Sequence, residues 1–178
     1  MSDHQQRFNR QSIRLKEYDY TQQGLYFVTI CTIERLMMFG DVRGGKMELN
    51  FCGEIVRDEW LKTPVVRKYV ELDEFVVMPN HFHGILKITV GATRRVAPTT
   101  ENSRGPIRGS IGAIVGQFKS AVTKRINELN QSRRFIWQRN YYEHVIRDEN
   151  DLNRIRQYIS DNPMNWETDR NNIENLYM

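Results

Sequence analysis

The chain has 178 residues, of which 39% are hydrophobic and 27% charged, and its formal net charge is +4. This length suits one well-packed domain and is short for two. There is no apolar run long enough to cross a membrane and no apolar N-terminal stretch of the secretory type, which excludes membrane and secreted proteins and predicts a cytoplasmic one.

The first part of the chain predicts an arm, a strand and a hairpin. Residues 1–20 show no clear period and are expected to form an N-terminal arm. The β-branched and aromatic run 26–32 predicts a strand. Residues 36–39 and 46–49 flank Gly44-Gly45, a dipeptide that suits a tight turn with positive φ. These two segments predict a β-hairpin.

A helix and two strands are expected next. Asn50 can cap a helix whose apolar residues keep the 3.6-residue period. The strand-like runs 74–78 and 83–90 are joined through the tight segment 78–80. Residues 91–106 are rich in Thr, Gly, Pro, Ser and Arg, and this composition predicts a flexible basic loop.

The rest of the chain predicts two helices around a last strand. Ser110 is placed to cap a longer helix with one apolar stripe. A strand is expected to run through residues 135–137 towards residues 142–146. Asp148 then starts the final helix, which Pro163 ends or kinks.

In chain order these elements read β, α, β, β, α, β, with a hairpin insertion and an extra C-terminal helix. The order predicts an α+β protein of the ferredoxin-like type, with a four-stranded antiparallel sheet and both internal helices on one face. The last helix can cover the other face, because Leu152, Ile155 and Ile159 form a narrow apolar stripe. We expect residues 21–167 to form the domain and residues 168–178 to form a tail.

Two of the four histidines, His81 and His83, open the second of the paired strands. Side chains alternate between the faces of a strand, so both histidines point the same way and Phe82 points opposite. An isolated pair of this kind is more often a pair of hydrogen-bonded structural histidines. It is also half of a metal site on a rigid support.

The final helix offers partners for these histidines. At about 100° per residue, Tyr158 and Asn162 fall on one border of the apolar stripe. If the stripe docks on the sheet, both residues project beside the histidine strand. Two imidazoles and an amide oxygen would then form an open site that tolerates Mg²⁺ and suits Mn²⁺ better. Alternatively, Tyr158 is a packing residue and Asn162 only ends the helix.

A metal in this position would polarise a phosphate, and Tyr158 would supply the attacking oxygen. A phenol has a pKa of about 10, so it needs a nearby cation or metal to react at neutral pH. Arg154, one turn before Tyr158, is placed to help. A phosphotyrosine would keep the energy of the phosphodiester, and this favours strand transfer over simple hydrolysis.

Several motifs together resemble the HUH single-strand DNA transposases with one catalytic tyrosine, and within them the REP-associated tyrosine transposases of the IS200-like superfamily. The likeness spans residues 9–166. The motifs are residues 26–30 (YFVTI), 76–85 (VVMPNHFHGI), 136–139 (IWQR), 142–147 (YEHVIR), 158–159 (YI) and 162–166 (NPMNW).

The resemblance implies roles for four residues. His81 and His83 match the metal-binding pair of the family, Tyr158 matches the nucleophile, and Asn162 falls where a third, amide-bearing ligand is found. The family uses Mg²⁺ or Mn²⁺ and cleaves single-stranded DNA to leave a 5′-phosphotyrosine and a free 3′-OH. It recognises imperfect hairpins near the cleavage site. Related insertion-sequence enzymes carry Gln at the third-ligand position and exchange tyrosine helices in dimers, so both a monomer and a homodimer stay open here.

Positive charge is concentrated in one part of the chain. Residues 91–147 contain eleven Lys or Arg against three Glu and no Asp, which gives this stretch a charge of +8. Such asymmetry is typical of a protein that binds a phosphate backbone, and equally of a solvated face. The candidate DNA-binding residues lie in this stretch, in the N-terminal arm and in the final helix: Arg14, Arg94, Arg95, Arg108, Lys119, Lys124, Arg125, Arg139, Arg147 and Arg154.

Other interpretations remain for single residues and for the protein. Tyr141 and Tyr142 are rival nucleophiles that the strand context favours as packing or base-stacking residues. His144 is a fourth candidate ligand, but its strand lies away from the His81 strand, which favours a structural or DNA-contact role. The whole chain could also be a non-catalytic ferredoxin-like nucleic-acid-binding module, or a nickase of the HUH relaxase or replication-initiator type.

Overall fold

The computed structural model describes residues 19–89, 107–129, 135, 137–172 and 175. Most of the predicted N-terminal arm and the whole predicted loop 91–106 lie outside these residues. Within the described ranges, none of the helices combines the length and apolar character needed to cross a lipid bilayer.

The described residues form strands, α-helices and two short 3-10 helices in an alternating order. They are β1 (Gly24–Cys31), η1 (Ile33–Arg35), β2 (Gly40–Arg43), β3 (Lys46–Leu49), α1 (Phe51–Leu61), α2 (Thr63–Val66), β4 (Val70–Met78), β5 (His81–Ile88), α3 (Ile111–Leu129), β6 (Tyr142–Ile146), α4 (Glu149–Asp161) and η2 (Trp166–Thr168).

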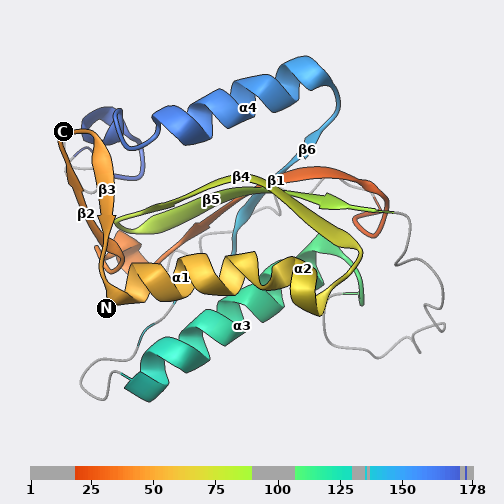
Figure 1. Cartoon of the computed structure of the whole chain (residues 1–178), viewed down its shortest axis with the longest axis horizontal. Coiled ribbons are helices and arrows are strands. Elements are labelled where there is room, and N and C mark those ends of the chain that lie inside the picture. The colour runs from red at the N-terminus through yellow and green to blue at the C-terminus, as the bar shows by residue number, and fades with distance from the viewer. Residues whose placement is uncertain (1–18, 90–106, 130–134, 136, 173–174, 176–178) are drawn as a thin grey trace, which may run out of the picture.

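One antiparallel sheet organises the molecule, with the strand order β4-β5-β1-β6. The strands β2 and β3 pair separately as a hairpin. Figure 1 shows α1 and α3 on one side of the sheet and α4 on the other. The predicted α+β, ferredoxin-like architecture with a hairpin insertion and a covering C-terminal helix is therefore confirmed.

Capping hydrogen bonds explain where two of the helices begin. The side-chain oxygen of Asn50 accepts from the backbone N–H of Cys52 at 2.9 Å and of Gly53 at 3.1 Å. Asp148 Oδ1 accepts from the N–H of Asp151 at 2.8 Å. These N–H groups have no partner within the first turn, so each cap contributes about 1 kcal/mol. Both helices start where the sequence predicts.

The first strand of the hairpin differs from the prediction. Residues 36–39 were expected to form it, but β2 begins at Gly40. The N–H groups of Met38 and Phe39 donate instead to the carbonyl of Pro79, and Phe39 is fully buried in the core. Because these backbone groups are committed to the turn between β4 and β5, they cannot pair with β3.

The last predicted strand is also wrong in its first part. Of the predicted strand, only the part that forms β6 pairs in a ladder with β1, and Trp137 makes a single isolated bridge with Thr32. The indole N–H of Trp137 donates to the carbonyl of Lys119 at 3.2 Å, and its ring lies 5.3 Å from that of Phe39. Side-chain packing holds this segment, so it does not extend the sheet.

Apolar side chains cover both faces of the sheet. The larger cluster, between the sheet and α1 and α3, includes Trp60, Phe82 and Phe118. The predicted stripe of α4 is confirmed, because its members pack on the opposite face and each contributes about 1.5–3 kcal/mol when buried. This smaller cluster consists of Phe27, Ile85, Ile146, Leu152, Ile155 and Ile159. It places α4 over the face of the sheet on which His81 and His83 of β5 lie.

Candidate active site

The two histidines of β5 are fully buried and held through one ring nitrogen each. Nδ1 of His81 lies 2.8 Å from Asn80 Oδ1, and Nδ1 of His83 lies 2.8 Å from Thr29 Oγ1. An amide oxygen only accepts, so His81 carries its proton on Nδ1 and presents a lone pair on Nε2. Ring orientation fixed through the far nitrogen is typical of metal-ligating histidines.

Burial keeps both imidazoles neutral at neutral pH. It lowers the pKa of His81 to about 4, although the negative charge of Asp169 acts in the opposite direction. Burial also lowers the pKa of His83 well below its usual value, and His81 adds to this effect. Neutral imidazoles can donate a lone pair to a metal without first losing a proton.

The residue that follows α4 brings an amide to the histidines. Asn162 is buried, and its Nδ2 donates to Asp169 Oδ2 at 3.0 Å. This bond orients the amide, and Asn162 Oδ1 has no hydrogen-bond partner among the described residues. His81 Nε2 is also buried and also has no hydrogen-bond partner among the described residues. Two such atoms are costly unless a ligand satisfies them.

A buried carboxylate completes the cluster. Asp169 follows η2, and the ligand atoms of His81, His83 and Asp169 all lie within 4.8 Å of one another. Together with the unpartnered oxygen of Asn162, this set of nitrogen and oxygen donors fits a divalent ion that prefers mixed ligands. The described residues therefore contain a group that could hold a metal.

Sequence reasoning gave no role to Asp169, which falls in the predicted tail. Nothing in its spacing marks it: it lies far along the chain from the histidines and outside any periodic element. Its position depends on tertiary hydrogen bonds of the segment after η2. Asn80 Nδ2 donates to the carbonyl of Asn171 at 2.8 Å, and Arg35 Nη1 donates to the carbonyl of Arg170 at 2.6 Å.

Tyr158 of α4 lies beside the histidines of its own chain. Its hydroxyl is 3.3 Å from His83 Nε2, and its ring meets that of Phe27 edge-on at 6.2 Å. Burial raises the pKa of Tyr158, and the charge of Asp169 raises it further, whereas Arg170 lowers it. The phenol is therefore protonated at neutral pH and needs added positive charge to become a strong nucleophile.

The arginine expected to assist Tyr158 is engaged elsewhere. Arg154 Nη2 bonds to Asp151 Oδ1 at 2.5 Å. The same carboxylate lies 2.7 Å from His144 Nε2, so His144 is tied to α4 and is not part of the metal-binding group found among the described residues. The charge that acts on the phenol is that of Arg170, which the sequence analysis did not single out.

A cavity of about 740 Å³, which we call the site cavity, opens beside Tyr158. Asn162, Asp169 and Arg170 line it near the histidines. Its wall also includes Phe27, Tyr142, His144 and Arg154. The two rival tyrosines have different environments. Tyr142 lines this cavity and is 36% exposed, whereas Tyr141 packs against the larger apolar cluster.

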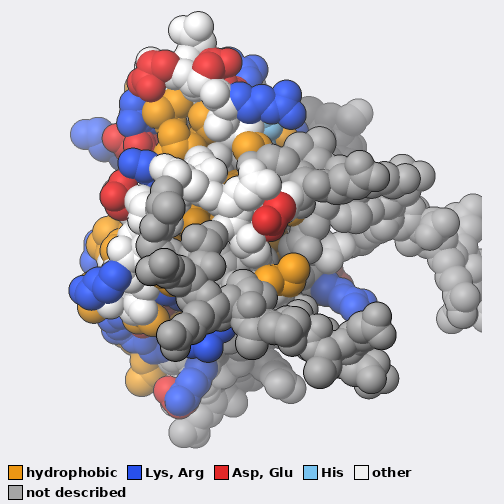
Figure 2. Space-filling view, turned by 90° about the vertical axis from the view of Figure 1, so that its right-hand side faces the viewer, with side chains coloured by type: hydrophobic (Ala, Val, Ile, Leu, Met, Phe, Trp, Pro, Cys, Tyr) orange, Lys and Arg blue, Asp and Glu red, His pale blue; other side chains and the backbone are white. Residues whose placement is uncertain are grey.

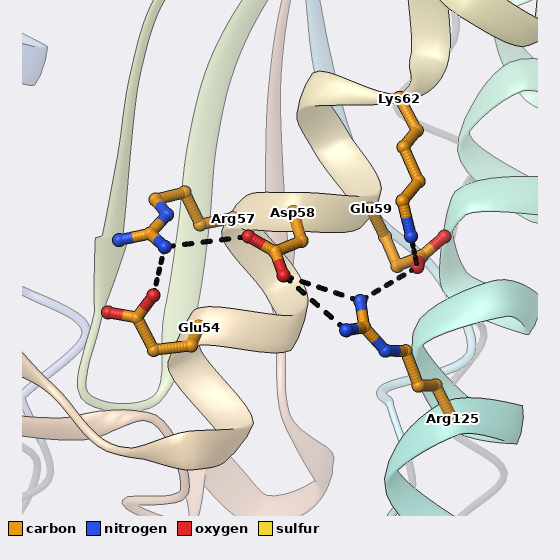
Figure 3. A network of polar contacts seen from close by, with 6 residues as sticks. All are labelled: Glu54, Arg57, Asp58, Glu59, Lys62 and Arg125. Carbon is orange, nitrogen blue, oxygen red and sulfur yellow. Dashed lines mark hydrogen bonds and ion pairs between the residues drawn. The ribbon is translucent and has the colours of Figure 1, made fainter.

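Several of the predicted DNA-binding side chains form hydrogen bonds or ion pairs within the protein. Lys119 Nζ donates to the carbonyls of Gln138 at 2.6 Å and Arg139 at 3.1 Å, and burial lowers its pKa. Figure 3 shows Arg125 of α3 bridging two carboxylates of α1. Lys124 Nζ lies 3.8 Å from Glu128 Oε1 on an exposed face.

Three other candidates, Arg108, Arg139 and Arg147, have exposed side chains. Arg14, Arg94 and Arg95 lie outside the described residues. In the view of Figure 2, basic and acidic side chains lie close together near the top of the molecule. Among the described residues on this face, positive and negative side chains are mixed.

Comparison with known proteins gives two relatives and several similar structures, whereas no family model matches the chain. An uncharacterised protein of Haemophilus influenzae is 41% identical over 167 residues, which is 91% of this chain and 92% of the other. The two proteins therefore belong to one family. A second Haemophilus influenzae protein, named provisionally as a REP-associated tyrosine transposase, is 26% identical over 151 residues, which is 82% of this chain and 73% of the other.

One of the similar structures is a REP-associated tyrosine transposase solved in complex with a REP hairpin. Its TM-score is 0.58 at 20% sequence identity, and the match covers 88% of this chain and 74% of that one. This likeness shows that the two chains share a fold.

Proposed function

We propose that this chain is an IS200-like HUH transposase, which cleaves single-stranded DNA with Tyr158 and transfers the cut strand. The observation that carries the proposal is the position of the Tyr158 hydroxyl, 3.3 Å from Nε2 of the buried His83, in a site where the buried Nε2 of His81 has no partner among the described residues. The proposal covers the nucleophile, the metal ligands, the reaction and the DNA.

In the proposed reaction, Tyr158 Oη attacks the phosphorus of a DNA phosphodiester. The Oη–P bond forms, the P–O3′ bond breaks, and the phenolic proton ends on the released 3′-oxygen. The products are a 5′-phosphotyrosine and a free 3′-OH. A 3′-OH of another strand can reverse the step, because the phosphotyrosine keeps the energy of the original bond.

His81 and His83 are the proposed metal ligands, with Asn162 Oδ1 and the carboxylate of Asp169 completing the set. A bound Mg²⁺ or Mn²⁺ would supply a Lewis acid that neutralises charge on the scissile phosphate. Asn80 and Thr29 hold the histidine rings so that Nε2 faces the site. Arg170 adds a positive charge that lowers the pKa of the Tyr158 phenol.

A hairpin in single-stranded DNA is the proposed partner. The related structure contains a REP hairpin, and this chain shares the fold of that protein. The exposed side chains of Arg108, Arg139 and Arg147 offer cations for phosphate contacts, unlike the paired Arg125. We propose that the target is an unpaired segment next to such a hairpin.

Adduct trapping tests this function. The protein is incubated with a pool of single-stranded oligonucleotides and Mn²⁺, and covalent species are separated on a denaturing gel and sequenced. We expect a protein–DNA adduct in the wild type, and its loss in Tyr158→Phe with binding retained. Tyr142→Phe is the matched control and should still form it.

Other outcomes would overturn the proposal in distinct ways. An adduct that persists in Tyr158→Phe moves the nucleophile to another residue. Binding without any adduct in the wild type indicates a non-catalytic binding module. An adduct that never passes its DNA to an added 3′-OH strand indicates a nickase and not a strand transferase.

A further inference from the structure

One wall of the site cavity is aromatic and includes Phe27 and Tyr142. In the sheet register, Thr29 of β1 pairs with His83 of β5 on one side and with Tyr142 of β6 on the other. These three side chains therefore share one row on the face beneath α4. His83, which contacts the proposed nucleophile, and Tyr142 are thus positioned by the same sheet.

Ring contacts through Phe27 connect Tyr158 to this wall. Phe27 stacks on His83 at 5.4 Å and 25°, and meets Tyr158 edge-on at 6.2 Å. The ring of Tyr142 lies 6.3 Å from Phe27 in an edge arrangement. Phe27 is buried, whereas Tyr142 is 36% exposed and lines the cavity. Tyr142 is therefore an aromatic side chain that its neighbours orient but do not cover.

The cavity also has a polar rim that α4 holds in place. Arg154 and His144 both bond to the carboxylate of Asp151. The Gln157 amide donates to Asp161 Oδ2 at 2.8 Å. These groups offer hydrogen-bond donors and acceptors around an apolar floor, which suits a flat, partly polar ligand.

The volume of the site cavity also suits a flat, partly polar ligand. A volume of about 740 Å³ falls in the range of pockets that enclose a small organic ligand. A DNA base is the ligand that the proposed reaction brings to this place, because the phosphate attacked by Tyr158 carries a nucleotide on each side. Aromatic side chains bind unpaired bases by stacking, whatever their sequence.

We propose that the site cavity binds one unpaired base adjacent to the scissile phosphate, stacked on Tyr142. The inference rests on the proposed function and names a substrate feature: the nucleotide beside the cut must be unstacked and free of a base-pairing partner. A base held in a duplex cannot enter the cavity, so Tyr142 contributes to the selection of single-stranded DNA.

The test combines a protein change with a DNA change in the Tyr158→Phe background, which prevents cleavage. Affinities are measured by fluorescence anisotropy for the oligonucleotide recovered from the trapped adduct. We expect Tyr142→Ala to weaken binding by about 5- to 150-fold, the usual loss for one stacked base. Tyr142→Phe keeps the ring and should bind as the parent does.

The decisive measurement moves an abasic site along the same oligonucleotide. At one position next to the cleavage site, the abasic DNA should bind the parent and Tyr142→Ala proteins equally, because the base that stacks is missing. Phe51→Ala, an exposed aromatic residue at the start of α1 on the other side of the sheet, should change nothing.

Equal loss with intact and abasic DNA at every position would overturn the inference, as would an unchanged affinity of Tyr142→Ala. Failure of the proposed function looks different, because the wild type would then form no adduct. In that case the affinity of oligo(dT) for Tyr142→Ala, Tyr142→Phe and the parent still decides whether Tyr142 stacks on DNA.

Discussion

The hydroxyl of Tyr158 lies 3.3 Å from Nε2 of His83, and both residues belong to the same chain. This contact is made possible by α4, whose apolar stripe packs on the face of the sheet that carries the histidine pair. In this arrangement the proposed nucleophile approaches the proposed metal ligands in cis, without a helix from a second copy.

Asp169 should strengthen metal binding. We expect His81→Ala to abolish Mn²⁺ binding and Asp169→Asn to weaken it by at least about tenfold, because Asn keeps the acceptor for Asn162 but removes the negative charge. Titration of Mn²⁺ followed by electron paramagnetic resonance measures the affinity. Asp161→Asn, near the same end of α4, is the control. Wild-type affinity in Asp169→Asn would remove this residue from the ligand set.

The metal-free protein should lose stability as the pH falls below 6.5. The pKa of His81 is about 4 in the folded state, so between these two values the unfolded chain binds the proton and the folded chain does not. For His81 the difference corresponds to at most about 3 kcal/mol of unfolding free energy, and His83, whose pKa is also lowered by burial, acts in the same direction. Urea denaturation at several pH values measures it.

His81→Gln should reduce this pH dependence but not abolish it, because burial also lowers the pKa of His83. The pKa of the Asp73 carboxyl is lowered chiefly by its hydrogen bond with Arg156, so its contribution is lost only below its ordinary value of 3.8. The histidine effect is thus confined to higher pH. A profile that is level from pH 6.5 to pH 4 in the wild type would contradict the prediction.

Packing of α4 should control the reaction through the position of Tyr158. Ile159 is buried against the sheet, and Ile159→Ala should lower the unfolding free energy by about 2–4 kcal/mol. We also expect slower adduct formation, because the helix that carries Tyr158 loses part of its apolar contact. Ser160→Ala, an exposed neighbour, is the control. Thermal denaturation and single-turnover adduct formation are the two measurements.

Removal of the Arg170 charge should shift the pH dependence of adduct formation. The guanidinium lowers the pKa of Tyr158, so Arg170→Gln raises that pKa and moves the rate profile to higher pH. Oligonucleotide binding and Mn²⁺ affinity are measured alongside, with Arg147→Gln as the matched control. A reduced rate with an unmoved profile would assign Arg170 to DNA binding and not to the phenol.

Salt dependence should separate free cations from paired ones. Arg139→Ala is expected to reduce the salt slope of single-strand binding by about 0.7 log unit per log unit of salt, because one phosphate contact is lost. Arg125→Ala should leave the slope unchanged, since its guanidinium is bound to Asp58 and Glu59. The slope comes from affinities measured over a series of salt concentrations. Equal slopes in the wild type and Arg139→Ala would exclude this residue from the DNA path.

Local rules explain the elements that the sequence predicted well. The caps at Asn50 and Asp148 depend on side chains within three residues of the N–H groups that they satisfy, and the stripe of α4 depends on a single period. The same local rules wrongly predicted strands for residues 36–39 and for Trp137. Both have strand-like composition, but their backbone or side-chain groups are bound to distant parts of the chain.

The sequence by itself determined the order of strands and helices, the shared face of His81 and His83, and the shared border of Tyr158 and Asn162, because these follow from helix and strand periods. Only the tertiary structure decided that α4 docks on its own sheet, that Asp169 joins the histidines, and that Arg170 and not Arg154 acts on the phenol. Those relations depend on packing and hydrogen bonds between residues far apart in the chain, which no local period encodes.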